Sequence, residues 1–189
     1  MKKHFIIVGG ANDAGKTTFA YQYKEEYGID YLGADEIAHR LSEKENGNIE
    51  LKAGKAFFRQ MSDYLSRKKS VIVESTLSGR GLEGKIRDFK EKGYAVHIVY
   101  VFLGSVALCK KRVQMRVKKG GHDVPEAEIE RRYKRSIINF RQLYMPLADT
   151  WQLLYNNLSR PIEVAYGEEG NTIIVDDEYY AVFQEIISE

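Results

Sequence analysis

Residues His4–Phe19 read HFIIVGGANDAGKTTF, and the strand, loop and helix that they predict determine the class of fold. The stretch opens with the apolar run Phe5–Val8, which is short and rich in β-branched residues, as in a buried parallel strand. Residues 10–17, GANDAGKT, match the phosphate-binding pattern G-x-x-x-x-G-K-[ST] without a mismatch. We expect a helix over about residues 16–27, whose N-terminus attracts phosphate. This context favours a nucleotide-binding site over a glycine-rich turn that fits the pattern by chance.

Each residue type in this loop has a physical role in holding phosphate. Gly10 and Gly15 allow a backbone with positive φ, so that successive N–H groups point inward. The Lys16 ammonium supplies a point charge for the β- and γ-phosphates of ATP, and the Thr17 hydroxyl is a predicted ligand of Mg²⁺. The predicted cofactor-binding residues are therefore Gly10, Ala11, Asn12, Asp13, Ala14, Gly15, Lys16, Thr17 and Thr18.

The composition is that of an ordinary globular protein. The chain has 189 residues, 43% hydrophobic and 30% charged, and we expect a single domain over residues 1–189. No apolar run approaches the roughly 20 residues that cross a bilayer, and Met1–Lys3 leads into the first strand without a signal peptide. The single cysteine, Cys109, cannot form an internal disulfide, so we expect a reducing, cytoplasmic location and no membrane contact.

Charge is distributed unevenly along the chain, although the formal net charge is only +2. Residues 110–141 contain eleven lysines and arginines against four acids, whereas residues 162–189 contain eight acids and no lysine or arginine. The basic segment suits either nucleic acid or the triphosphate of a nucleotide. The acidic end is typical of a solvated surface.

Two predicted strands end in acids. Asp35 follows the predicted strand Gly28–Ala34, and Glu74 follows the apolar run Val71–Val73. Both acids belong to the carboxyl edge of the sheet, where ligands bind in open α/β folds. Asp35 is a candidate for catalysis, or alternatively for the N-cap of the next helix. Glu74 is a candidate to organise Mg²⁺ or water, to contact substrate, or to pair with a surface lysine.

Residues of about 105–145 have the features of a mobile lid. The periodicity predicts helices over Val106–Lys119 and Glu126–Leu143, and Gly120–Pro125 interrupts them. A cationic lid closes over a triphosphate and excludes water, whereas the alternative is a solvated basic hairpin. The arginines on the two arms are Arg112, Arg116, Arg131, Arg132 and Arg135.

The rest of the chain predicts further elements of an α/β fold. Helices are expected over residues 49–67, 82–92 and 178–187, and strands over residues 94–103 and 149–155. Residues 162–175 are expected to form a β-hairpin, because two alternating runs flank the glycine-containing turn Gly167–Gly170.

Five motifs, taken together and in this order, resemble those of the zeta toxin family: GGANDAGKTT, LGADEIAHRL, VIVESTLSGR, GGHDVPEAEIERRY and TWQLLYNN. The likeness is to the short, zeta-toxin-like bacterial branch and covers about Phe5–Val175. It implies a P-loop kinase core, in which a parallel sheet carries helices on both faces. It also implies transfer of the γ-phosphoryl group of ATP, with Mg²⁺, to the sugar 3′-hydroxyl of UDP-N-acetylglucosamine.

The resemblance assigns roles to individual residues. Lys16 and Thr17 match the family's phosphate-loop residues, and Asp35 matches its general base. On the acceptor side, Glu74 and Thr76 match the E-x-T-L motif. Arg116 and either Arg131 or Arg132, of which we select Arg132, resemble the two lid arginines that hold the transferring phosphoryl group. We further predict that Arg80 contacts the substrate, that Arg112 contacts the nucleotide, and that Glu74 is a metal ligand.

The sequence departs from the toxin pattern on the acceptor side. The family's phenylalanine and basic residue after the aspartate are missing from Asp35–Ile37, and Gly120–His122 is a turn that those toxins lack. Both departures therefore bear more on the choice of nucleotide sugar than on the kinase assignment. Two other hypotheses stay open: a nucleic-acid-binding NTPase or polynucleotide end kinase, which we disfavour because no stacking platform is evident, and a toxin held by an antitoxin protein.

Overall fold

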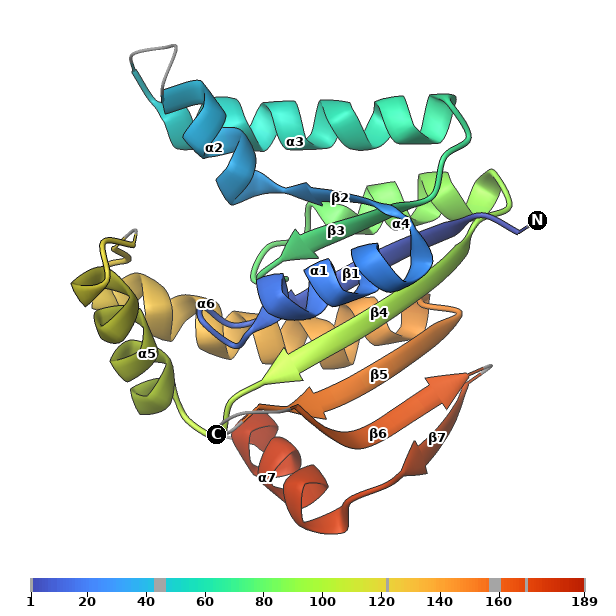
Figure 1. Ribbon diagram of the computed structural model, residues 1–189. Coiled ribbons are helices and arrows are strands. Elements are labelled where there is room, and N and C mark those ends of the chain that lie inside the picture. The colour runs from blue at the N-terminus through green and yellow to red at the C-terminus, as the bar shows by residue number, and fades with distance from the viewer. Residues whose placement is uncertain (1, 43–46, 122, 157–160, 169, 189) are drawn as a thin grey trace.

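The computed structural model describes residues 2–42, 47–121, 123–156, 161–168 and 170–188, and its centre is a seven-stranded sheet (Figure 1). The strands are β1 His4–Gly10, β2 Asp30–Gly33, β3 Val71–Ser75, β4 Ala95–Phe102, β5 Thr150–Tyr155, β6 Ile162–Glu168 and β7 Asn171–Ile174. Their order in the sheet is β2-β3-β1-β4-β5-β6-β7. The first five of these strands are parallel to one another. β6 pairs antiparallel with β5, and β7 pairs antiparallel with β6. This confirms the predicted α/β fold with a parallel sheet and a C-terminal hairpin.

Helices cover both faces of the sheet, as predicted (Figure 1). They are α1 Lys16–Tyr27, α2 Ala34–Ser42, α3 Ile49–Ser66, α4 Leu82–Glu91, α5 Val106–Lys118, α6 Glu126–Asn139 and α7 Asp177–Ser188. On one face, Ala20 of α1 packs against Ile6 and Val8 of β1. The larger core on the other face includes side chains from α3, α4, α6 and α7. No helix in the described ranges is both long and apolar enough to cross a membrane.

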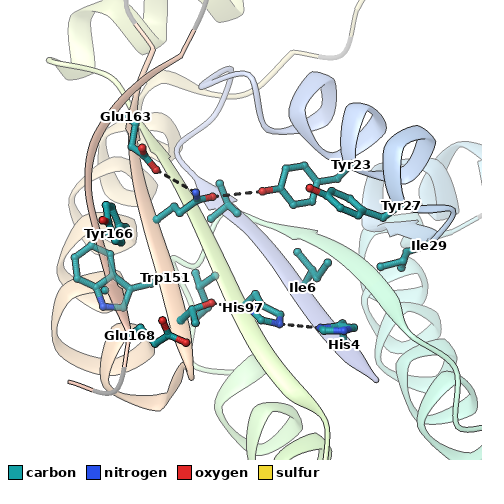
Figure 2. Close-up of a pocket in the computed structure, with 15 residues that line it drawn as sticks. His4, Ile6, Tyr23, Tyr27, Ile29, His97, Trp151, Glu163, Tyr166 and Glu168 are labelled. Atoms are coloured by element: carbon teal, nitrogen blue, oxygen red, sulfur yellow. Dashed lines mark hydrogen bonds between the residues drawn. The ribbon is translucent and has the colours of Figure 1, made fainter. Parts of the chain in front are cut away.

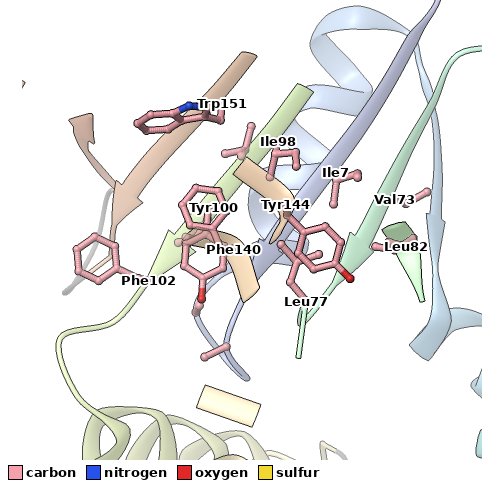
Figure 3. Close-up of a cluster of buried hydrophobic side chains, with 14 of the residues drawn as sticks. Ile7, Val73, Leu77, Leu82, Ile98, Tyr100, Phe102, Phe140, Tyr144 and Trp151 are labelled. Atoms are coloured by element: carbon pink, nitrogen blue, oxygen red, sulfur yellow. The ribbon is translucent and has the colours of Figure 1, made fainter. Parts of the chain in front are cut away.

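Aromatic rings fill the centre of the larger core (Figure 3). Phe140 stacks on Tyr100 of β4, with ring centroids 4.2 Å apart and planes 6° from parallel. The ring centroids of Trp151 and Phe183 each lie 6.2 Å from that of Phe140, in edge-to-face arrangements. The Phe140 ring therefore joins β4, β5 and α7. These contacts bury Phe140 completely, and its packing links the C-terminal helix to the sheet.

The chain after α6 differs from the predicted continuous helix through Leu143. The α-helix ends at Asn139, continues as the π-helical segment Phe140–Tyr144 and closes with the 3₁₀ turn Met145–Leu147. The Met145 N–H donates to the carbonyl of Phe140, five residues earlier. A π turn holds more residues than an α turn, and Phe140 and Tyr144 are both buried in the core. Helical periodicity in the sequence does not separate these two forms.

We expect Phe140→Ala to lower the free energy of unfolding by about 3–5 kcal/mol, because it leaves a cavity among the three rings of Tyr100, Trp151 and Phe183. Urea denaturation followed by the fluorescence of Trp151, the single tryptophan, measures this change. Ile138→Ala is the matched control, since Ile138 lies in the preceding turn and is 39% exposed. Equal effects of the two substitutions would contradict the central role of Phe140.

Candidate active site

The phosphate loop leaves β1 through a space that only glycine fits. Gly10 has φ +146°, and a Cβ there would lie 2.1 Å from the carbonyl oxygen of Val101 in β4. Gly15 has φ +95° and forms the N-cap of α1. Asp13 also adopts a left-handed backbone, with φ +54°. These positive φ angles curl the loop around the N-terminus of α1. This is the arrangement predicted for holding phosphate.

The Lys16 side chain is buried beside the loop. Its ammonium group donates a hydrogen bond to the carbonyl oxygen of Ala11 at 2.8 Å, and it lies 3.9 Å from Oε1 of Glu74. Glu74 reaches this position because β1 and β3 are neighbours, with Val8 in register with Glu74. The strand order therefore places an acid beside the phosphate-loop lysine, although 58 residues separate the two in sequence.

One hollow of about 820 Å³ at the carboxyl edge of the sheet gathers most of the predicted site residues. The predicted residues that line it are Asn12, Asp13, Gly15, Lys16, Thr17, Thr18, Asp35, Glu74, Thr76, Arg116 and Arg132. The aromatic side chains Phe57, Phe58 and Tyr144 form another part of its wall. The hollow therefore combines a phosphate-binding end with an aromatic part that could receive a second molecule.

Five predicted residues do not line this hollow. Gly10, Ala11 and Ala14 form the loop itself, behind the lining residues. Arg80 pairs with Glu83 at 3.2 Å and its side chain is 74% exposed, so the structure does not bring it to the other residues. Arg112 lies on the far side of the loop, and it borders a separate hollow of about 590 Å³ between the loop and α5.

Asp35 lies in the first turn of α2 and is exposed. Its carboxylate makes no hydrogen bond or ion pair within the described residues, so it does not act as the helix cap that was the alternative prediction. The carboxylate lines the hollow together with Lys16 and Glu74. A carboxylate without a protein partner is a suitable proton acceptor, provided that an acceptor hydroxyl binds within hydrogen-bond distance.

Arginines approach the hollow from both predicted lid helices. Arg116 of α5 forms an ion pair with Oδ1 of Asp13 at 3.2 Å. In α6, both Arg131 and Arg132 pair with Glu128, at 2.6 and 3.1 Å. The hydrogen bonds from Arg131, together with the charges of both arginines, lower the pKa of Glu128. Both residues line the hollow, so the choice between Arg131 and Arg132 stays a prediction.

The predicted lid is anchored by its second helix. Gly120, with φ +85°, follows α5 and turns the chain, while His122 lies outside the described residues. Along α6, Tyr133 and Ile137 are buried in the core, and the Tyr133 hydroxyl donates to the carbonyl of Leu103 at 2.8 Å. In Figure 1, α5 projects beyond the carboxyl edge of the sheet, whereas α6 runs behind the sheet. Closure of this segment stays a prediction.

Sequence reasoning missed the polar residues that hold the acceptor-side loop after β3. In this loop Leu77 has the strained φ of +56°. The Ser136 hydroxyl donates to the carbonyl of Thr76, and the Asn139 amide donates to that of Leu77 at 2.9 Å. The Tyr144 hydroxyl donates to the carbonyl of Gly79. Polar groups at positions 136, 139 and 144, three and five positions apart in a segment that also carries buried apolar residues, were the available signal.

Asn156, directly after β5, was also missed. Its amide nitrogen donates to the carbonyl of Ala14 at 2.8 Å, and its carbonyl accepts from Arg112 at 3.0 Å. Arg112 also donates to the carbonyl of Asp13 at 3.3 Å. Asn156 and Arg112 thus brace the phosphate loop from outside the hollow. Asn156 lies in the TWQLLYNN motif, but that motif gave it no role, because the contact depends on which strand lies beside the loop.

Another hollow, of about 680 Å³, lies on the sheet face beside α1 and contains none of the predicted residues (Figure 2). Its polar groups bond to one another. Tyr23 donates to Gln152 at 3.4 Å, and Gln152 donates to Glu163 at 3.1 Å. His97 lies 2.9 Å from His4 and 2.6 Å from Thr150. Burial lowers the pKa of His97, in agreement with a neutral histidine in a structural network.

The profile of the AAA domain family matches residues 5–136, which include the phosphate loop, Asp35, Glu74 and Arg116. The chain belongs to the AAA domain family. An uncharacterized protein of Haemophilus influenzae is 27% identical over 133 residues, which cover 70% of this chain and 94% of that relative.

Solved structures with the same fold include kinase-like and toxin-related proteins. Two structures of the AvrRxo1-ORF1:AvrRxo1-ORF2 complex, one with sulphate ions and one with ATP, contain a chain that superposes with TM-scores of 0.78 and 0.76 at 17% and 18% identity. The aligned part covers 98% of this chain and 64% of that chain. A chain of the PezAT toxin–antitoxin system of Streptococcus pneumoniae has a TM-score of 0.68 at 18% identity, covering 99% and 79%. At these identities the likeness establishes the P-loop kinase-like fold.

We expect Asn156→Ala to weaken ATP binding about fivefold, because a brace on the loop worth about 1 kcal/mol is lost. Isothermal titration calorimetry with Mg-ATP measures the change. Asn171→Ala, at an exposed position in β7, serves as control. Unchanged affinity in Asn156→Ala would mean that the loop keeps its shape without this side chain.

Proposed function

We propose that the protein is an ATP-dependent small-molecule kinase of the zeta toxin type, which transfers the γ-phosphoryl group of ATP to a hydroxyl of a nucleotide sugar. The observation that carries this proposal is the single hollow lined by Lys16, Asp35, Glu74, Arg116 and Arg132. It combines a phosphate loop, the Asp35 carboxylate, which has no hydrogen-bond or ion-pair partner among the described residues, and cations from two helices. Membership of the AAA domain family and the likeness to a chain solved with ATP support the nucleotide assignment.

Each of these residues has a separate role in the proposed reaction. The phosphate loop and Lys16 hold the β- and γ-phosphates, while Asp35 accepts the proton of the acceptor hydroxyl. The hydroxyl oxygen then forms a bond to the γ-phosphorus, and the bond to the bridging oxygen breaks, so that ADP leaves. Little covalent chemistry falls to the protein, because positioning and charge neutralisation account for most of the catalysis of phosphoryl transfer.

Thr17 and Glu74 suit a Mg²⁺ site that is completed by the nucleotide. Both line the hollow next to Lys16, and the described residues contain no group of three or more acids, histidines and cysteines that would form a protein-only metal site. Mg²⁺ is usually bound by one or two carboxylates together with substrate phosphates, which agrees with this donor set. When bound, the ion neutralises charge on the phosphate oxygens.

The arginines are proposed to neutralise the transferring group. Arg116 forms an ion pair with Asp13, and Arg132 forms one with Glu128. When the nucleotide binds, each arginine would exchange its carboxylate partner for phosphate oxygens. By analogy with arginine fingers, the loss of such a contact costs on the order of 10³–10⁵ in rate. Arg112 is proposed to contact the nucleotide from the hollow beside α5, and Arg80 remains a proposed substrate contact that would require movement of its loop.

The acceptor is proposed from two observations. The motifs ADEI, VESTL and the arginine-bearing helices resemble those of zeta toxins, and aromatic side chains line the same hollow as the phosphate loop. UDP-N-acetylglucosamine is therefore the first acceptor to test. The likeness to a chain of the PezAT toxin–antitoxin system extends the proposal to a toxin role with an antitoxin partner, which growth arrest on expression, relieved by a neighbouring gene product, would support.

We expect UDP-N-acetylglucosamine incubated with the protein and Mg-ATP to gain one phosphate, as measured by mass spectrometry. Lys16→Ala is expected to abolish the product, because the β- and γ-phosphates lose their point charge. Parallel reactions offer other nucleotides, metabolites and an RNA with a 5′-hydroxyl end. A product from the RNA alone would replace the nucleotide-sugar proposal with a polynucleotide end kinase.

We expect Asp35→Asn to keep the affinity for ATP and to lose phosphoryl transfer, since it removes the proton acceptor and keeps the shape. Single-turnover transfer and Mg-ATP titration measure the two properties separately. Asp177→Asn, also in the first turn of a helix but far along the chain in α7, controls for the charge change. Normal transfer by Asp35→Asn would exclude this residue as the base.

A further inference from the structure

Glu74 is held by a tyrosine from the neighbouring strand. The Tyr31 hydroxyl donates a hydrogen bond to Oε2 of Glu74 at 2.8 Å. The other carboxylate oxygen, Oε1, faces the Lys16 ammonium at 3.9 Å. Each oxygen of Glu74 therefore has a different neighbour, and the hydrogen bond from Tyr31 fixes which oxygen faces the phosphate loop.

The geometry of the two strands makes this contact possible. β2 and β3 are parallel, with Tyr31 in register with Ile72 and Gly33 with Glu74. Tyr31 and Gly33 lie two residues apart, so they occupy the same face of β2. The phenol ring extends along the strand, over Gly33, towards Glu74. A Cβ at position 33 would lie 2.3 Å from the Tyr31 hydroxyl oxygen, so glycine keeps this path open.

Further contacts keep the Tyr31 ring in place. The ring lies 5.0 Å from that of Tyr21 in α1, and the Tyr21 hydroxyl donates to Glu36. Packing against Tyr21 therefore holds the Tyr31 ring where its hydroxyl reaches Glu74.

We propose that Tyr31 is the positioning residue of Glu74, and that Gly33 is required for its reach. This inference rests on the proposed function, in which Glu74 serves the Mg²⁺ and acceptor side of the site. Tyr31 keeps one carboxylate oxygen occupied, and so it prevents Glu74 from turning fully onto Lys16. Lys16 then stays available to the nucleotide phosphates, and Glu74 keeps the orientation needed for transfer.

The test is Tyr31→Phe, which removes the hydroxyl and keeps the ring. A hydrogen bond to a charged group is lost, so we expect kcat to fall about 10- to 100-fold, with the KM for ATP changed by less than about twofold. Tyr23→Phe is the matched control, because Tyr23 packs on the same sheet face and its hydroxyl contacts Gln152 instead. In a Glu74→Gln background, Tyr31→Phe should cause no further loss.

A second measurement needs no activity. In protein labelled with ¹³C at the glutamate carboxyl carbons, the Glu74 signal, assigned with Glu74→Gln, should shift in Tyr31→Phe and not in Tyr23→Phe. An unmoved signal would overturn the proposal whether or not the protein transfers phosphate. A shifted signal with unchanged kcat would also overturn it, because the contact would then have no role in positioning. A shifted signal in a protein that phosphorylates no acceptor would support the contact and refute the proposed function.

Discussion

The close approach of Gly10 to β4 is the constraint on which the site depends. Because only glycine permits this approach to the Val101 carbonyl, the chain leaves the sheet between β3 and β4 and turns directly into the phosphate loop. Glu74 from β3 then lies on one side of the loop, and Asn156 after β5 braces it from the other. A larger residue at position 10 would displace the loop from both neighbours.

The acceptor side depends on α6 in a comparable way. Ser136 is fully buried, and its single hydroxyl proton goes to the Thr76 carbonyl, so the Tyr100 hydroxyl must be the donor in the 2.7 Å contact between Tyr100 and Ser136. Together with Asn139, this chain of hydrogen bonds holds Leu77 in a backbone conformation that non-glycine residues seldom adopt. The same bonds fix the later half of α6 to the sheet. Any closing movement is therefore confined to α5, the turn at Gly120 and the first turns of α6.

The sequence could predict the parts of the site that follow from local pattern. Lys16 and Thr17 come from a motif, and Asp35 and Glu74 follow from the rule that ligands bind where parallel strands end. Tyr31, in contrast, could not be assigned a role, because its contact with Glu74 depends on the lateral order of β2 and β3. Residues that act across the sheet carry no periodic or motif signal, since their spacing in sequence is set by the intervening helices.

The lack of a local sequence signal also explains the smaller differences between the predicted and the observed structure. The π-helical turn after Asn139 has the same apolar pattern as an α-helix, so the sequence does not signal it. Arg80 follows the VESTL motif in sequence, yet its pairing with Glu83 turns it away from the hollow. Arg131 and Arg132 cannot be separated by phase, because both reach Glu128.

The outer edge of the sheet has a consequence for handling the protein. β7 ends the sheet, and its apolar residues Ile173 and Ile174 are 50% and 44% exposed. Such an edge is a template for pairing with another chain, and natural proteins protect edges with charge. Here Glu168 of β6, in register with Asn171 of β7, places a negative charge beside this edge, so we expect two copies to repel one another there. High salt or acid weakens the repulsion, and concentrated stocks are best kept at low ionic strength and neutral pH.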